Sequence, residues 1–220
     1  MKLNSINLAR ATWLFPVIDL NPTGKSLYPV VEWLIVNYKF KKYPATNDEF
    51  DLAKGIKFES GEYKTENGEV IIINLTVYND GIIADSRHST KESDKFLNEM
   101  LTHVSANYNL PDYRKIIRRK GYLSNVYVTT DKALEMLNPK LKRLSDYISN
   151  NFSDPPDTHY ELGTISFWPE QGTSAMRLPL FTFERAANVP FSENRYFSSA
   201  GLQTDKHIEA LNKLEKILIE

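Results

Sequence analysis

The hydrophobic positions between residues 90 and 108 recur at helical spacing. Ser89 immediately precedes this segment, and Glu92 lies three residues after Ser89, which is the arrangement of a capping box. The apolar side chains that share one helical face are Phe96, Leu97, Met100, Leu101, Val104 and Tyr108. The pattern predicts an amphipathic helix from about 90 to 107 that packs on a sheet.

The first ninety residues carry the patterns of strands and tight turns. Residues 11–20 and 30–40 are rich in Val, Ile, Trp, Phe and Tyr, and turn residues at 21–24 separate them, which predicts two N-terminal strands. Further on, Ser60-Gly61, Asn67-Gly68 and Asp80-Gly81 divide short β-prone runs at hairpin spacing. We therefore expect an antiparallel meander with strands near 56–59, 62–65, 69–78 and 81–86.

The second half predicts further strands and two more helical regions. Residues 122–130, 160–168 and 178–184 have the composition of strands. Pro139 interrupts a helical pattern, so that either one helix is kinked or a second begins at the proline. The positions expected to face inward there are Leu134, Leu137, Leu141, Leu144 and Ile148. A C-terminal helix is expected at 205–219, with Ile208, Leu211, Leu214, Ile217 and Leu218 inward.

Strands precede helices along the chain, which favours an α+β fold over alternating α/β architecture. We expect a mainly antiparallel sheet, formed by the N-terminal strands and the meander, packed by two or three amphipathic helices. The length of 220 residues suits a single domain covering 1–220. The Asp-Pro-Pro-Asp run at 154–157 marks a possible subdomain break near 153–158.

Composition narrows the class of protein without naming a reaction. The chain has no cysteine, which excludes disulfides, thiolate catalysis and cysteine-based metal sites and fits a cytoplasmic location. No apolar run approaches the roughly 20 residues that span a bilayer, so no membrane is expected. The net charge of −1 gives no global attraction to nucleic acid. Residues 44–99 nevertheless carry 12 acidic and 6 basic residues, and 112–143 carry 3 and 9, which could neutralise one another within the fold or across an oligomer.

Short motifs for phosphate binding and metal binding are incomplete. Gly24-Lys25-Ser26 resembles the end of a phosphate-binding loop, but Asp19 stands where the first glycine belongs, so a plain turn is expected. No metal site or cofactor is predicted. The residues considered for a metal-dependent nuclease are Asp51, Glu62 and Lys64, and those considered for a mixed carboxylate and imidazole site are Asp80, Asp85 and His88. No G-x-S-x-G sequence indicates a nucleophilic serine, although a site assembled from distant residues stays possible.

Two stretches are candidates for contact with a macromolecule. The basic stretch consists of Arg114, Lys115, Arg118, Arg119 and Lys120, which on a helix would present a phosphate-binding side. Tyr113 and Tyr122 flank it and could stack on bases. The other candidate is the long connection from 185 to 203. Its aromatic and arginine content resembles an interface, or else its aromatic residues complete the core. The interaction residues proposed there are Arg185, Asn188, Phe191, Glu193, Asn194, Arg195, Tyr196 and Phe197.

The sequence favours a non-enzymatic protein that binds another protein or forms a homodimer, through the loop near 188–201 and the amphipathic C-terminal helix. The alternative is a nucleic-acid-binding protein or metal-dependent nuclease that uses the 114–120 basic stretch. No catalytic motif was found, so enzymatic activity is not predicted.

Overall fold

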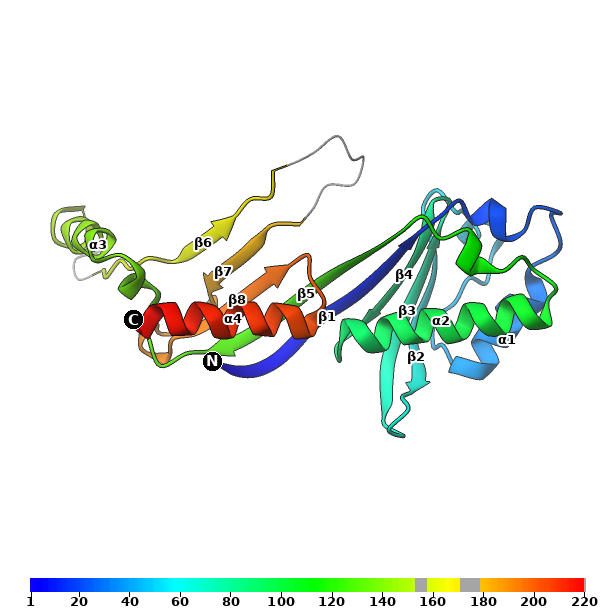
Figure 1. Ribbon diagram of the computed structural model, residues 1–220, viewed down its shortest axis with the longest axis horizontal. Helices are drawn as coiled ribbons and strands as arrows, with labels where there is room; N and C mark the ends of the chain where they lie inside the picture. Colours follow the sequence, from blue (N-terminus) through cyan, green and yellow to red (C-terminus); the bar gives the residue numbers. More distant parts are fainter. Residues whose placement is uncertain (153–157, 171–178, 220) are drawn as a thin grey trace. The chain divides into compact units, whose positions relative to one another are not determined.

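The computed structural model describes residues 1–152, 158–170 and 179–219. It confirms an α+β fold with a mainly antiparallel sheet (Figure 1). The strands are β1 (Lys2–Leu14), β2 (Ile56–Lys64), β3 (Val70–Tyr78), β4 (Gly81–Ser86), β5 (Arg119–Thr129), β6 (Thr164–Phe167), β7 (Phe181–Arg185) and β8 (Arg195–Ala200). The α-helices are α1 (Tyr28–Tyr38), α2 (Thr90–Asn107), α3 (Pro139–Phe152) and α4 (Thr204–Ile219). Among the described helices, none is both long enough and apolar enough to cross a membrane.

The strand order in the sheet is β2-β3-β4-β1-β5-β8-β7-β6. The chain forms two compact units. Unit 1 contains residues 1–7, 125–201 and 205–220, and unit 2 contains residues 8–124 and 202–204. Strands β1 and β5 contribute residues to both. A single domain stays a prediction, and the expected break near 153–158 falls mainly on residues outside the described part of the chain.

Unit 2 has its core between the meander and helix α2. Five of the six apolar residues predicted for the inner face of α2 are buried, and Tyr108 is partly buried at its C-terminal cap. The Ser89 Oγ accepts a hydrogen bond from the Glu92 N–H at 3.2 Å, which confirms the predicted start of the helix. Helix α2 lies against β4, and Figure 1 shows it (green) beside the meander strands. The central prediction of a helix packed on this sheet is confirmed.

The predicted strand at 30–40 is wrong, because residues 28–38 form helix α1. Pro29 stands at the first turn of this helix, where its missing N–H costs no hydrogen bond. Leu34 and Tyr38, four residues apart, are the buried positions, while Val36 on another side is exposed. Apolar residues on several sides of α1 hide its helical period, so composition alone favoured a strand. The first predicted strand is confirmed in part, since β1 begins earlier and ends at Leu14.

The expected turn at Ser60-Gly61 is also wrong, because both residues lie within the single strand β2. The register of β2 against β3 shifts between Phe58 and Gly61, and Ser60 has a φ of 58°. This is the geometry of a β-bulge, which uses the same residue types as a turn. A Cβ on Gly61 would lie 2.5 Å from the Phe40 ring, so glycine allows that ring to approach the strand.

Unit 1 has a second, smaller core formed by β7, β8, the second half of β5 and helix α4. Phe183 stacks on Tyr196 with ring centroids 4.5 Å apart, and both rings are buried. Leu211 and Leu214 of α4 belong to this core as predicted, and Leu218 is also buried. Ile217 was expected to face inward but is exposed, because it lies on a different side of the helix from Leu211, Leu214 and Leu218.

Pro139 begins helix α3 after a short 3-10 helix at Leu134–Leu137, so the prediction of two separate helices is the one confirmed. Leu134 is buried as expected. Leu141 and Leu144 were also expected to face inward but are exposed among the described residues, as is Tyr147. Helix α3 is therefore amphipathic, with its apolar side largely open.

Candidate ligand-binding site

Unit 2 contains an apolar cavity of about 440 Å³. Nineteen residues line it, and all of them are Val, Leu, Ile, Met, Phe or Tyr. Ligand pockets in proteins are typically about 300–1,000 Å³ and lined mainly by apolar and aromatic side chains. The cavity therefore has the size and lining of a binding site for a small apolar molecule.

Three elements supply the walls. Helix α2 contributes Met100, Leu101 and Val104, the same face that packs on the sheet. The strands contribute residues such as Phe58 from β2 and Ile82 from β4, both of which are buried. The sheet and α2 thus form two walls of the cavity, and the residues named here also belong to the hydrophobic core of the unit.

Helix α1 forms the remaining wall with Val30, Val31 and Leu34. Contacts with α2 and its C-terminal end hold α1 in place. The Trp33 ring stacks on the His103 ring at 4.0 Å with an interplanar angle of 6°. The Tyr108 hydroxyl donates a hydrogen bond to the Pro29 carbonyl at 3.2 Å. The wall is therefore fixed by a few polar and aromatic contacts at its outer side.

Exposed aromatic and aliphatic side chains mark the mouth of the cavity. Leu27, Tyr28 and Phe50 all line it and are 39%, 63% and 39% exposed. Large apolar side chains at the surface cost solvation free energy, and a group of them beside an apolar cavity is typical of a binding site. These residues place the entrance between the start of α1 and the segment around residue 50.

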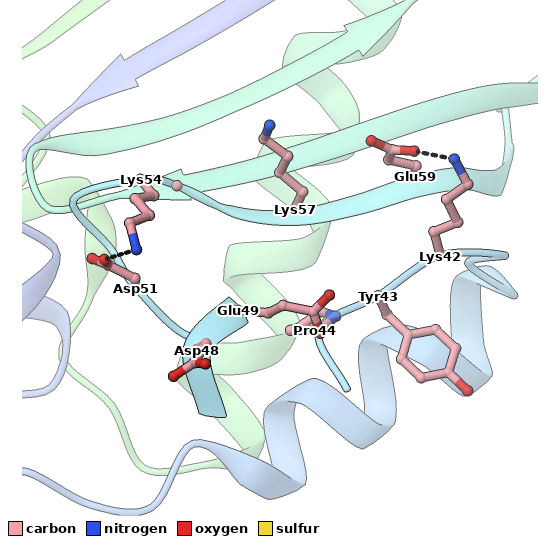
Figure 2. A pocket seen from close by; sticks show the side chains of 10 residues that line it. Lys42, Tyr43, Pro44, Asp48, Glu49, Asp51, Lys54, Lys57 and Glu59 are labelled. Carbon is pink, nitrogen blue, oxygen red and sulfur yellow. Dashed lines mark ion pairs between the residues drawn. The ribbon is translucent and has the colours of Figure 1, made fainter. Parts of the chain in front are cut away.

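A charged recess lies near residues 42–59 (Figure 2). Its volume is about 350 Å³, and its side chains carry both signs of charge. The Lys42 Nζ lies 3.2 Å from the Glu59 Oε2, and the Lys54 Nζ lies 3.4 Å from the Asp51 Oδ2. Each of these exposed ion pairs is compensated within itself, which leaves Asp48, Glu49 and Lys57 as the other charged side chains of the recess.

The residues considered for metal binding are not brought together. Asp51 pairs with Lys54, whereas Glu62 on β2 pairs with Lys39 at 2.8 Å. Lys64 is exposed on the same strand as Glu62. Among the residues that the structure describes, no three His, Asp or Glu side chains are placed to hold a metal ion. The nuclease arrangement considered from the sequence does not form.

The second set considered for a metal site is likewise dispersed. Arg10 holds Asp85 with two hydrogen bonds of 2.7 Å each, and the pKa of Arg10 is raised mainly by this hydrogen bonding. The His88 Nε2 lies 3.3 Å from the Glu69 Oε2, and Glu69 is not one of the residues considered for this metal site. Asp80 lies in the turn between β3 and β4.

The Gly24-Lys25-Ser26 segment begins at the end of a turn, in which the Gly24 N–H donates to the Asn21 carbonyl at 3.1 Å. The Asn21 side chain accepts a hydrogen bond from the Lys25 N–H at 3.0 Å, and Gly24 has a φ of 60°. The Lys25 Nζ donates to the Asn109 carbonyl at 3.0 Å. These bonds tie the lysine to the end of α2, so the turn supports the cavity mouth next to it.

The basic stretch is not a helix, which corrects the arrangement expected from the sequence. Residues 113–115 form one 3-10 turn, and β5 begins at Arg119, so Arg114 and Arg118 do not share a helical side. Tyr113 is buried in the core and cannot stack on a base. All five basic side chains, Arg114, Lys115, Arg118, Arg119 and Lys120, are exposed.

Several of these cations are already occupied by acidic partners. Lys120 lies over the Trp13 ring at 3.7 Å and pairs with Asp94 at 3.3 Å. Asp94 also accepts the Tyr122 hydroxyl at 3.2 Å. Arg118 pairs with Asp19 at 3.9 Å. Binding of nucleic acid stays a prediction, and the geometry adds no support to it.

The connection from 185 to 203 is more ordered than expected, because it contains β8. Tyr196 is buried and its hydroxyl accepts the Leu134 N–H at 3.0 Å, so this aromatic completes the core. Arg185 pairs with Glu161 and lies 4.5 Å from the centre of the Phe191 ring. Both interactions are internal to unit 1.

The remaining interaction residues lie at the surface or close to it. They are Asn188, Glu193, Asn194, Arg195 and Phe197. Asn188 and Asn194 both have positive φ, which identifies them as turn residues on either side of the 3-10 helix at Phe191–Glu193. Arg195 lies over the Tyr127 ring at 5.6 Å. A role in contact stays a prediction for this group.

A buried pair formed by Ser198 and His207 escaped the sequence motifs. The Ser198 Oγ lies 2.9 Å from the His207 Nε2 and 2.6 Å from the Thr182 carbonyl oxygen. A hydroxyl proton donated to a carbonyl leaves the oxygen to accept from the imidazole N–H. Both residues are fully buried, and the pair links β8 to α4.

No known protein-family model and no curated protein matches this chain. An assignment of function therefore depends on the geometry described above. The apolar cavity was not predicted from the sequence, because its lining residues extend from Phe15 to Leu110 without a linear motif. The signal that could have indicated it is the helical spacing of Val30, Val31 and Leu34 behind Pro29.

Proposed function

We propose that the protein is a non-enzymatic binding protein that takes a small apolar molecule, or the apolar part of a larger one, into the cavity of unit 2. The observation that carries this proposal is a cavity of about 440 Å³ whose lining residues are all apolar or aromatic. At about 30 Å³ for each water-sized group, the space is equivalent to roughly fifteen such groups. An alkyl chain or a fused ring system fits this size.

The chemistry of the lining determines what the ligand can carry into the cavity. None of the nineteen lining residues bears a charge, and the only side-chain polar atom among them is the hydroxyl of Tyr28 at the mouth. A charged group placed inside would lose its hydration without gaining a partner, which is strongly unfavourable. The inserted part of the ligand is therefore uncharged hydrocarbon. Each buried methylene contributes about 0.8 kcal/mol, which is roughly a fourfold gain in affinity.

Filling the cavity from within tests the proposal. Val31 lines the cavity from α1, whereas Val36 on the same helix is 77% exposed and does not line it. We expect Val31→Trp to weaken binding of the neutral fluorophore N-phenyl-1-naphthylamine at least tenfold, because the indole occupies the ligand's space. Val36→Trp, the matched control, should leave binding unchanged.

Binding is measured as the saturable rise in fluorescence on titration with protein, and thermal unfolding checks that each variant is folded. A series of neutral alcohols that compete with the fluorophore should gain roughly fourfold per methylene until the cavity is full. The proposal fails if the folded wild type shows no saturable binding, or if Val31→Trp and Val36→Trp bind equally well.

A second candidate function is self-association through helix α3 of unit 1. Leu144, Tyr147 and Phe152 on this helix are exposed among the described residues, and such a strip is typical of a helix that packs against another surface. This keeps the homodimer expected from the sequence but moves its contact from the loop near 188–201 and the C-terminal helix to α3. Sedimentation equilibrium should show a dimer for the wild type and a monomer for Leu144→Glu, with Asn150→Glu as the control. A wild-type mass equal to one 25.3 kDa chain would exclude the dimer.

A further inference from the structure

The mouth of the apolar cavity opens beside a polar recess. Phe50 and Leu52 line both the cavity and a neighbouring recess of about 450 Å³. The other residues of that recess include Asn47, Asp48 and Asn79. A molecule that fills the cavity and extends past Phe50 would therefore pass from a hydrocarbon lining directly onto amide and carboxylate groups. This sequence of environments matches a molecule with an apolar tail and a polar head.

The acidic groups near the recess differ in how far their charge is compensated. Asp51 pairs with Lys54 at 3.4 Å and also accepts the Ala53 N–H at 2.9 Å. The Glu49 carboxylate accepts the N–H groups of Ala45 and Thr46 at 2.7 and 3.0 Å, and so it is used to cap the local turn.

Asp48 differs from both neighbours. Among the described residues it forms no ion pair, and Figure 2 shows its carboxylate on the short 3-10 turn with no dashed line to a cation. Asp51 and Lys54 cancel each other within the recess, so Asp48 leaves it with a net negative charge. The amides of Asn47 and Asn79 add no charge to this balance.

We infer that the ligand is a single-tailed amphiphile with a cationic head, such as a primary alkylamine, whose tail fills the cavity and whose ammonium group lies against Asp48. This inference rests on the proposed function of the cavity. A carboxylate head at the same place would be repelled by Asp48, and an uncharged hydroxyl head would be neither attracted nor repelled. The preference is electrostatic and close to solvent, so it decreases as salt is added.

Competition between ligands that differ only in their heads tests the inference. Decylamine, decanol and decanoate, each below its micellar concentration, compete with N-phenyl-1-naphthylamine for the wild-type protein at pH 7 and low salt. We expect decylamine to bind about tenfold more tightly than decanoate, with decanol between them, because at this pH the amine is positive and the carboxylate negative. The ratio should decrease at least threefold in high salt.

Asp48→Asn keeps the shape of the side chain and removes its charge, and should reduce the ratio of amine to carboxylate affinity to below about threefold. Asp131→Asn, in unit 1, is the matched control and should leave the ratio unchanged. Equal binding of all three ligands, or an unchanged ratio in Asp48→Asn, would overturn the headgroup assignment while leaving the apolar cavity as a binding site. If neither the fluorophore nor any ligand binds the folded wild type, the cavity proposal fails and the headgroup assignment with it.

Discussion

Truncating Phe96 and Phe50 in separate variants distinguishes the core of unit 2 from the border of its cavity. Phe96 is fully buried on α2, with its ring 4.9 Å from the Tyr38 ring and 5.5 Å from the Tyr63 ring. Phe50 is 39% exposed and lies at the cavity mouth. The same change to alanine therefore removes a ring from two different environments.

The expected costs differ by several kcal/mol in the free energy of unfolding. Removal of a buried Phe side chain costs about 3–5 kcal/mol, through lost transfer free energy and the cavity left behind. The two edge-on aromatic contacts of Phe96 each add about 0.5–1.5 kcal/mol beyond buried area, which places Phe96→Ala at the upper end, about 4–5 kcal/mol. Phe50→Ala should cost less than about 1 kcal/mol, because its ring lies at the cavity mouth and not in the core, and under the proposed function it should weaken ligand binding.

Urea denaturation followed by tryptophan fluorescence measures both costs. Trp168 belongs to unit 1, so a Trp168→Phe background leaves Trp13 and Trp33, both in unit 2, as the source of the signal. The midpoint and the slope of each curve give the change in unfolding free energy. A cost below about 2 kcal/mol for Phe96→Ala, or an equal cost for Phe50→Ala, would refute the assignment of these rings to core and cavity mouth.

Three further predictions concern single interactions in unit 2. Ser89→Ala removes the N-cap of α2 and should lower the free energy of unfolding by about 1 kcal/mol in the same urea assay, and no change would contradict the cap. Asp85→Asn breaks the double hydrogen bond to Arg10 and should cost about 1.5–3 kcal/mol, which a double-mutant cycle with Arg10→Gln assigns to the pair. Burial, followed by the hydrogen bond to Glu99, raises the pKa of Tyr63 above its usual value near 10, so the folded state keeps a proton that the unfolded state loses. Stability should therefore be complete below pH 10 and decrease above it, and Tyr63→Phe should make that decrease shallower by up to about 1.4 kcal/mol per pH unit, whereas an unchanged slope would rule out this contribution.

Elements with one clear apolar face were predictable from the sequence, and elements without one were not. Helix α2 has a cap signal and a single inner face, and its predicted bounds agree with the structure. Helix α1 carries Val and Ile on several sides, and a window of that composition fits a strand as well as a helix. The Ser60-Gly61 pair failed for a different reason, since a residue with positive φ occurs both in hairpin turns and in this β-bulge at Ser60.

The candidate site could not be predicted from sequence patterns, because its residues carry no recognisable motif. The patterns identified chemistry-bearing side chains, and the structure pairs several of these with other charged residues, as for Asp85 with Arg10 and Lys120 with Asp94. The cavity depends instead on apolar residues, and the sequence does not distinguish the apolar residues that line it from those that do not. Leu97 and Leu101 are one turn apart on α2 and equally apolar, yet only Leu101 lines the cavity.

The existence of the cavity links binding to the stability of unit 2. Protein interiors contain few voids larger than a water molecule, because side chains beside a void lose dispersion contacts and no other interaction replaces them. An occupant of the 440 Å³ space, as proposed, would restore those contacts and would make the unit more stable than it is without one. At a free ligand concentration of 100 times Kd, the gain is about 2.7 kcal/mol. Because every lining residue belongs to unit 2, a ligand in the proposed site would stabilise that unit, and its affinity and the added stability would be two measurements of one free energy.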